Sequence, residues 1–325
     1  MGKDLPVVPC CYVERFGLGL IYELWHSANN NEEGELTMTT AVPRKIMLAT
    51  DLTPAGDRAF DRAVELASEW NAELVVLHVA ESNSARPWGM VRRIRNAETE
   101  MEALVRSAKQ PCKIVRHTAI GDPADRALAH ARQFGCDFVV TGPAHGKIVG
   151  EKFLGSTAAR IVRRAMVPVL AVRRRPEGPY RSIVGAVDFS DPSRRALLGG
   201  RALFPSARLT ALHAYRIEPN WSGRNAERSI DAVEAEERER VIKEAKGKMA
   251  ELAAAAGAGA QAIETEVLEG EPEVVLADYV ARNWPDLIVA GTHGRSAVEH
   301  DTIGSVAERF LMTLPCDVLA VPTRN

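Results

Sequence analysis

The most informative pattern in the sequence is the stretch Pro285-Asp-Leu-Ile-Val-Ala-Gly291-Thr-His-Gly294. Its apolar run is short, rich in Leu, Ile and Val, and followed at once by glycines. A run without strict alternation of polar and apolar residues is typical of a strand buried on both faces, as in a parallel sheet. Further on, Gly304-Ser305 begins a segment with helical periodicity. The stretch therefore predicts a strand, a glycine-rich loop and a helix.

Most of this pattern occurs twice in the chain. Earlier in each copy, a buried run ends in an aspartate, and a turn containing proline follows it. The matching pairs, with the first copy named first, are Asp51 with Asp188, Gly121 with Gly270, Gly142 with Gly291, and Gly155-Ser156 with Gly304-Ser305. Agreement at so many ordered positions identifies an internal repeat, which has to be recognised before a fold is assigned.

Each copy alternates predicted strands with predicted helices, and such alternation favours right-handed βαβ crossovers. We therefore predict an α/β fold made of two tandem, doubly wound parallel sheets. Residues 1–43 are expected to be a disordered or spurious N-terminal extension, with Met38 as an alternative start. The first domain is expected over 44–173 and the second over 181–323, with a linker of prolines, glycine and charge at 174–180.

Composition excludes several classes of function. The 325 residues include 41 basic and 43 acidic side chains, and the formal net charge is -2. A protein that neutralises nucleic-acid phosphates is usually more basic, so we expect no nucleic-acid partner. No apolar run approaches the length of about 18 residues that a membrane helix needs, so we expect no membrane partner. Five cysteines without metal-ligand spacing indicate reduced thiols in a cytoplasmic chain.

Several charged or polar groups have a structural interpretation. The segment 226–256 is predicted to be a surface helix packed on the sheet, with a coiled-coil partner helix as the alternative. The histidines inside apolar strands, His78 and His213, are interpreted as satisfied core residues. The aspartates before the fourth strand of each copy, Asp137 and Asp286, are assigned to turns. Two basic clusters, Arg163-Arg164 and Arg173-Arg174-Arg175, are interpreted as a solvated helix end and linker.

The glycines of the second copy form the spacing G-x2-G-x9-G-S, from Gly291 through Gly294 to Gly304-Ser305. Glycine lets backbone N–H groups approach phosphate oxygens closely, and a helix N-terminus attracts an anion. In open α/β sheets, ligands bind beyond the carboxyl ends of the strands, where this loop is predicted. The alternative is a glycine-rich turn followed by an ordinary capped helix.

Asp188 ends the first strand of the second copy and could accept hydrogen bonds from ribose hydroxyls or a base amino group. Its alternative role is to cap the next helix with Ser190 or Asp191. His293 and Arg295 flank the glycine loop and could contact phosphate, or could simply be exposed. None of the nucleophile, metal-protease, Walker or kinase motifs is present in the sequence, so no catalytic residue is assigned.

Taken together, these motifs resemble the universal stress protein family in its tandem-domain form, over residues 44–323. The resemblance implies a five-stranded parallel sheet in the order 3-2-1-4-5 in each copy, an adenine nucleotide alpha hydrolase-like fold. It implies ATP as the ligand, with Mg²⁺ as its usual companion. By resemblance, the residues around the nucleotide in the second copy would be Asp188, the main chain at Ala214, Gly291, His293, Gly294, Arg295, Gly304, Ser305 and Val306. It also implies pairing of the two last strands as an intrachain pseudo-dimer, and it allows a homodimer.

The first copy departs from the family pattern at the loop. His145 stands where the second copy has Gly294, and Pro143 removes one backbone N–H. Lys147 and Lys152 could bring positive charge, and Gly146 could replace the missing glycine by a one-residue shift. The residues that we predict for this site are those that match the site of the second copy. They are Asp51, Val79, Gly142, Gly155 and Ser156. The two sites are therefore expected to be unequal.

These observations predict an ATP-binding, cytoplasmic stress-response regulator with at most slow ATP hydrolysis. One alternative is an ATP-dependent enzyme of the same fold superclass, which would need a positioned acid, base or nucleophile. The other is a nucleotide-free protein-interaction module, which would have no ATP affinity in either copy. The sequence names neither the stress signal nor the downstream partner.

Overall fold

The computed structural model describes residues 42–81, 87–142, 157–217, 230–255, 262–292 and 305–322. All of them belong to one compact unit, Thr40–Asn325. The expected N-terminal extension and the alternative start at Met38 lie outside the described residues, apart from 42 and 43. Among the described residues, no helix combines the length and the apolar character needed to cross a membrane.

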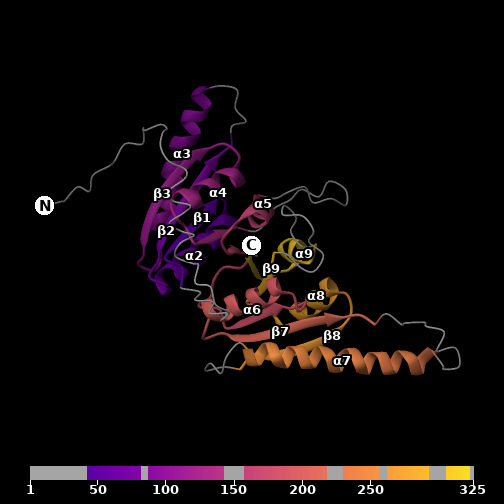
Figure 1. The fold of residues 1–325 in the computed structure, drawn as a ribbon. Helices are drawn as coiled ribbons and strands as arrows, with labels where there is room; N and C mark the ends of the chain where they lie inside the picture. Colours follow the sequence, from indigo (N-terminus) through magenta and orange to yellow (C-terminus); the bar gives the residue numbers. More distant parts are fainter. Residues whose placement is uncertain are drawn as a thin grey trace, which may run out of the picture. The chain divides into compact units, whose positions relative to one another are not determined.

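The two copies have matching elements, which Figure 1 colours from indigo to yellow along the chain. In the first copy these are β1 (Lys45–Thr50), α2 (Pro54–Glu69), β2 (Glu73–Ala80), α3 (Pro87–Arg106), β3 (Lys113–Ile120), α4 (Pro123–Gln133), β4 (Phe138–Thr141), α5 (Thr157–Arg164) and β5 (Val169–Ala171). In the second they are β6 (Ser182–Ala186), α6 (Asp191–Leu203), β7 (Arg208–Tyr215), α7 (Ile230–Ala255), β8 (Glu264–Glu269), α8 (Pro272–Asn283), β9 (Leu287–Gly291), α9 (Ser305–Thr313) and β10 (Asp317–Val321).

The strand order is β3-β2-β1-β4-β5-β10-β9-β6-β7-β8. Within each copy the strands are parallel and follow the order 3-2-1-4-5, which confirms the predicted fold class. The two sheets meet edge to edge, because β5 pairs antiparallel with β10 and places Leu170 beside Leu319. The expected pairing of the last strands is thus present within one chain and produces a single ten-stranded sheet.

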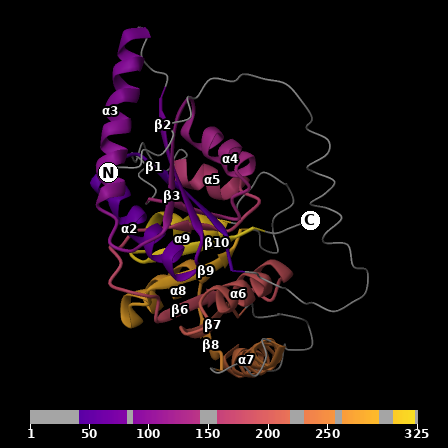
Figure 2. The same ribbon diagram turned by 90° about the vertical axis from the view of Figure 1, so that its left-hand side faces the viewer.

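Helices cover both faces of the sheet, as a doubly wound fold requires. One apolar cluster packs α2, α3, α6 and α7 against one face, with Phe60, Met101 and Leu197 fully or almost fully buried. The other packs α4, α5, α8 and α9 against the opposite face, around Ile161 and Phe310. In Figure 2, α2 and α3 lie on one side of the first copy's strands, and α4 and α5 lie on the other.

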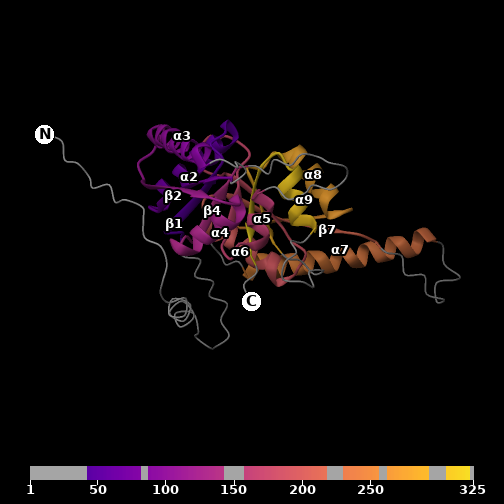
Figure 3. The same ribbon diagram turned by 90° about the horizontal axis from the view of Figure 1, so that it is seen from above.

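The predicted surface helix is α7, which runs along β7 and β8 (Figure 1). Ala245, Met249 and Leu252 of its C-terminal part are buried against the sheet, so the packed-helix interpretation is confirmed. Figures 1 and 3 show its N-terminal part reaching beyond the strands. The helix also carries exposed ion pairs, such as Arg240 with Glu237 at 2.6 Å.

The interpretation of residues 173–175 as a solvated linker is wrong for two of the three arginines. Arg173 and Arg174 are half-buried and bind the second copy through both backbone and side chain. Their guanidinium groups donate to the carbonyl oxygens of Leu311 and Pro315, respectively. The cause is the β5–β10 pairing, which carries the chain directly over the end of α9. Only Arg175 is exposed as predicted.

A buried carboxylate organises this junction. Asp317 is 1% exposed and accepts hydrogen bonds from the backbone N–H groups of Arg173 and Arg174, at 2.7 and 3.1 Å. The hydroxyl of Tyr180 donates to it at 2.6 Å, and Nε of Arg62 lies 3.9 Å away. The guanidinium of Arg62 stacks 4.0 Å from the ring centroid of Tyr180. Asp317 therefore ties α2, the linker and β10 together.

The described thiols are unsuited to redox or nucleophilic roles. Cys112, Cys136 and Cys316 are not in disulfide bonds. Burial raises the pKa of both Cys136 and Cys316 to about 12, so neither forms a thiolate near neutral pH. These two side chains belong to the apolar core.

Replacing Asp317 by alanine is expected to destabilise the protein by about 3–5 kcal/mol, because Arg62 would lose a buried countercharge and two N–H groups their acceptor. Tyr180→Phe removes one hydrogen bond and should cost only about 1 kcal/mol. Urea denaturation followed by circular dichroism measures both. A loss below about 1 kcal/mol for Asp317→Ala would show that this carboxylate does not hold the junction together.

Candidate functional site

Three predicted residues of the second copy lie at the carboxyl ends of adjacent strands. The parallel registers pair Ala186 of β6 with Leu212 of β7, and Gly185 of β6 with Val289 of β9. Two residues further along the first register, Asp188 lies beside Ala214. Two residues further along the second, Gly291 reaches the same edge of the sheet. The order β9-β6-β7 therefore gathers all three at one end of the sheet.

The first copy repeats this arrangement. Thr50 of β1 pairs with His78 of β2, and Ala49 pairs with Thr141 of β4. The residues that follow these pairs in the three strands are those predicted from the repeat, Asp51, Val79 and Gly142. The structure thus brings together the described half of each predicted site, from strands that are far apart in the sequence.

Each aspartate holds the turn that starts the next helix. Oδ1 of Asp51 accepts from the backbone N–H of Thr53 at 3.0 Å and from its hydroxyl at 2.7 Å. In the second copy, Ser190 makes the same two bonds to Asp188, with its N–H at 3.0 Å. Thr53 and Ser190 are the N-caps of α2 and α6. The N-cap of α6 is therefore Ser190 and not Asp191, and Asp188 holds Ser190 in place.

The residue after each aspartate adopts a left-handed conformation. The φ angle is 60° at Leu52 and 63° at Phe189, although neither residue is glycine. Such a conformation costs about 1–3 kcal/mol in a non-glycine residue and persists only where the surroundings impose it. Here it turns the chain sharply, so that the strand's aspartate and the helix N-terminus lie at the same place. Both copies carry this strain at the edge where ligands bind in open α/β sheets.

The two strand histidines support the same edge. Nδ1 of His78 lies 3.0 Å from the carbonyl oxygen of Thr50, and Nδ1 of His213 lies 2.7 Å from that of Val187. A carbonyl oxygen only accepts, so Nδ1 carries the proton in each ring. The interpretation as satisfied histidines is confirmed. They are half-buried near the strand ends, however, and not part of the core.

Gly291 has a packing role that the sequence does not reveal. A Cβ at this position would lie 3.0 Å from the carbonyl carbon and oxygen of Pro192, in the first turn of α6. The end of β9 and the start of α6 can therefore approach this closely only because Gly291 has no side chain. This glycine would be required at the strand end whether or not a phosphate binds nearby.

Two supporting residues occupy one repeat position and were missed by the sequence analysis. In the first copy it is Gly56, where a Cβ would lie 2.8 Å from Oδ1 of Asp51. In the second copy it is Ser193, whose hydroxyl accepts from the N–H of Asp188 at 3.3 Å. The signal available in the sequence was a small residue five positions after the aspartate that ends the first strand of each copy.

A cleft opens beside the turn of the second copy. Its volume is about 460 Å³, and Phe189, Leu252, Arg194 and Lys248 contribute to its lining. Phe189 directly follows Asp188, and the Lys248 ammonium lies 5.6 Å from the centroid of its ring. The cleft therefore combines an apolar surface with two cations and the carboxylate of Glu251.

The remaining predicted residues divide into two groups. Ser305 and Val306 form the first turn of α9, so a helix begins where the sequence predicts one. The others lie outside the described residues; in the second copy these are His293, Gly294, Arg295 and Gly304, and in the first copy Pro143, His145, Gly146, Lys147, Lys152, Gly155 and Ser156. The structure therefore describes the strand side of each site and, in the second copy, the helix start.

The aspartates assigned to turns lie at the opposite edge of the sheet. Asp137 accepts from the N–H groups of Arg44 and Lys45 at 2.9 and 3.1 Å. Asp286 accepts from those of Arg181 and Ser182 at 2.8 and 3.0 Å. Each ties the start of the fourth strand of its copy to the start of the first, which confirms the structural assignment. Within the ranges that the structure describes, no three His, Cys, Asp or Glu side chains converge as a metal site.

The model of the universal stress protein family matches residues 43–173 and, a second time, residues 179–322. The chain belongs to the universal stress protein family. Its two family matches make it a tandem member. A universal stress protein of Methanocaldococcus jannaschii is 32% identical over 156 residues, which cover 46% of this chain and 87% of that protein. A second, of Bacillus subtilis, is 32% identical over 146 residues, covering 40% and 98%.

Solved structures show the same fold over most of the chain. A universal stress protein of Archaeoglobus fulgidus superposes with a TM-score of 0.60 at 17% identity, and covers 85% of this chain and 98% of its own. A functionally unknown protein of Pseudomonas aeruginosa gives a TM-score of 0.61 at 18% identity, with 87% and 93% covered. At these identities the likeness supports the fold and not a ligand.

The packing role of Gly291 can be separated from any binding role. Gly291→Ala is expected to destabilise the protein by about 1–3 kcal/mol, because the added methyl group meets the backbone of Pro192. Gly199→Ala, in α6, is the matched control, since a Cβ there meets nothing within 4 Å. It should leave stability unchanged or raise it by up to about 1 kcal/mol. Equal urea midpoints for the two variants would contradict the close approach of β9 to α6.

Proposed function

We propose that this tandem universal stress protein binds ATP at the carboxyl edge of its second copy and acts as a stress-response regulator with at most slow ATP hydrolysis. The observation that carries the proposal is the convergence of Asp188, Ala214 and Gly291 at that edge, in line with the glycine spacing that leads to α9.

The strand order supports the place. From β6 the chain moves outward to β7 and β8, then crosses back to β9 on the other side of β6. Open α/β sheets bind ligands where the strand order reverses in this way, beyond the carboxyl ends of the strands, which here are those of β6 and β9. Gly291 ends β9, and Asp188 follows the end of β6 by two residues.

The chemistry of the edge supports the ligand. The first N–H groups of α9, which begins at Ser305, have no partner within the helix and attract an anion. Asp188 uses Oδ1 to hold Ser190, which fixes its carboxylate at the strand end, where it can accept from a ribose hydroxyl. Phosphate at the helix and ribose at the aspartate are together the recognition expected for a nucleotide, with Mg²⁺ as the companion of its phosphates.

A regulator fits the site better than an enzyme does. Among the described groups at the edge, the Asp188 carboxylate and the Ser190 hydroxyl hold the turn at the start of α6. Nδ1 of His213 is bonded to a main-chain carbonyl oxygen, so these groups have structural roles. An ATP-dependent enzyme of the same fold would show steady-state turnover at or above about 1 s⁻¹. A nucleotide-free interaction module would show no ATP affinity at all.

Isothermal titration with ATP and Mg²⁺ tests the site. Gly294→Val should weaken the tighter binding at least about tenfold, because a side chain there blocks the approach of backbone N–H groups to phosphate. Gly146→Val, in the loop of the first copy, is the matched control and should leave that binding unchanged. Wild-type protein that binds no adenine nucleotide, or Gly294→Val protein that binds as wild type does, would overturn the proposal.

The first copy offers a gain-of-function test. His145→Gly restores the spacing G-x2-G-x9-G-S from Gly142 to Ser156. If the glycine spacing is what makes the sites unequal, this variant should bind additional ATP in the first copy with an affinity closer to that of the second. Unchanged stoichiometry and affinity in His145→Gly would show that the loop residue does not limit the first site.

A further inference from the structure

The junction between the copies contains a pocket that is separate from both predicted nucleotide sites. Its volume is about 670 Å³. Six arginines line it, and we call it the arginine pocket; they are Arg58 and Arg62 of α2, Arg173, Arg174 and Arg175 after β5, and Arg181 before β6. None of the described residues predicted to bind nucleotide lines it. In the second copy it lies near the amino ends of β6, β9 and β10, at the opposite edge from Asp188.

The pocket has an excess of positive charge. Its lining contains six arginines and three carboxylates, Glu177, Asp286 and Asp317. The formal charge of the lining is therefore +3. Asp286 and Asp317 already accept hydrogen bonds from backbone N–H groups. The cations therefore outnumber the carboxylates that face them.

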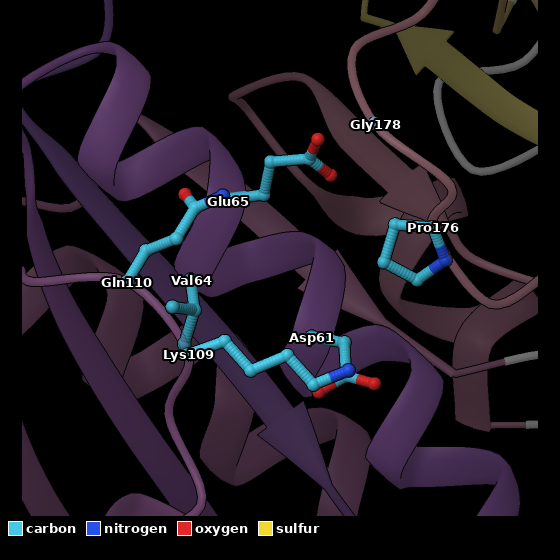
Figure 4. A pocket seen from close by; sticks show the side chains of 7 residues that line it. All are labelled: Asp61, Val64, Glu65, Lys109, Gln110, Pro176 and Gly178. Atoms are coloured by element: carbon cyan, nitrogen blue, oxygen red, sulfur yellow. The ribbon is translucent and has the colours of Figure 1, made fainter.

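Two of the arginines have acidic partners on α2. Figure 4 shows the smaller adjoining cavity, of about 130 Å³, where Asp61 and Glu65 lie across from the linker at Pro176 and Gly178. Asp61 lies 3.5 Å from Arg175, and Glu65 lies 2.7 Å from Arg62. In the part of the chain that the structure describes, the other four arginines have no carboxylate within ion-pair distance of their guanidinium groups.

Buried donors in the pocket lack acceptors. Nε of Arg62, Nε of Arg173 and Nη2 of Arg174 are buried, and none has a hydrogen-bond acceptor among the described residues. Arg62 is itself only 5% exposed. Burial lowers the pKa of Arg173, because its charged form is poorly solvated there. Unsatisfied charged donors of this kind are costly, so the charge of these three guanidinium groups is only partly compensated within the protein. An anion in the pocket would add the missing countercharge.

Three of the guanidinium groups are already held in place by contacts within the protein. Arg174 donates from Nε to the carbonyl oxygen of Pro315 at 2.9 Å and stacks 5.1 Å from the ring centroid of Trp284. Arg58 donates to the carbonyl oxygen of Arg173 at 3.0 Å, and Arg62 to that of Gly178 at 2.9 Å. A ligand would therefore lose little binding energy to the ordering of these side chains.

We propose that the arginine pocket binds a small molecule that carries two or three linked phosphate groups. Arginine is the preferred side chain for phosphate, because its planar fork matches two phosphate oxygens at once. The volume lies in the range of small-molecule sites. The phosphates could belong to an inorganic polyphosphate or to the tail of a nucleotide, and the chemistry recognised is the same.

The test is titration of Gly294→Val protein, whose predicted nucleotide loop is blocked, with inorganic triphosphate. We expect saturable binding to one site per chain. The double variant Arg58→Gln/Arg181→Gln, made on the same background, removes two exposed guanidinium groups and should bind at least about tenfold more weakly. The control, Arg92→Gln/Arg132→Gln, makes the same change of net charge at exposed positions outside the pocket and should bind as the parent does.

Thermal unfolding of both double variants checks that the fold is retained. A parallel titration with ATP distinguishes the sources, since ATP binding that is tighter than triphosphate binding and is weakened by Arg58→Gln/Arg181→Gln assigns the pocket to a nucleotide tail. The proposed phosphate site in the arginine pocket would be overturned if triphosphate did not bind, or if the two double variants weakened triphosphate binding equally. Neither result bears on the ATP site of the second copy, which depends on the comparison of Gly294→Val with wild type.

Discussion

Strands β5 and β10 contribute only three paired positions, yet their antiparallel pairing joins two complete folds into one sheet. Each strand would otherwise be an exposed edge, which is a liability in any open sheet. Asp317, at the start of β10, secures the pairing, because it accepts from the chain that leaves β5 and from Tyr180 of the linker. The aligned position in the first copy is Pro168, so this anchor belongs to one copy only. The junction and the arginine pocket both follow from that asymmetry.

The alternation of short apolar strands with helices predicted two doubly wound parallel sheets, and the family resemblance implied their strand order. The repeat showed which residues correspond, and with them the edge where the candidate site lies. The placement of Asp188, Ala214 and Gly291 together needed only the rule that parallel strands end at one edge. The glycine loops themselves lie outside the described residues, so their geometry stays a prediction.

Other features depend on contacts that no local pattern encodes. Arg173 and Arg174 have the composition of a solvated linker, but the register of β5 against β10 brings them over the carbonyl oxygens that end α9. The packing role of Gly291 arises from Pro192, which is about a hundred residues away in the sequence. The positive φ of Leu52 and Phe189 goes against the local preference of both residues, and the surrounding turn imposes it.

The two copies keep the strand side of the site and differ in the loop. Both retain the aspartate and the left-handed residue after it. Both also retain the histidine whose Nδ1 is bonded to the carbonyl oxygen just before the aspartate. His145 and Pro143 mark the first copy as the weaker nucleotide site on sequence grounds. The most direct test of the nucleotide site is a crystal structure of the full chain grown with ATP and Mg²⁺. We predict nucleotide between the carboxyl ends of β6 and β9, with its ribose within hydrogen-bond distance of Asp188. A fully occupied nucleotide elsewhere, with that position empty, would contradict this prediction.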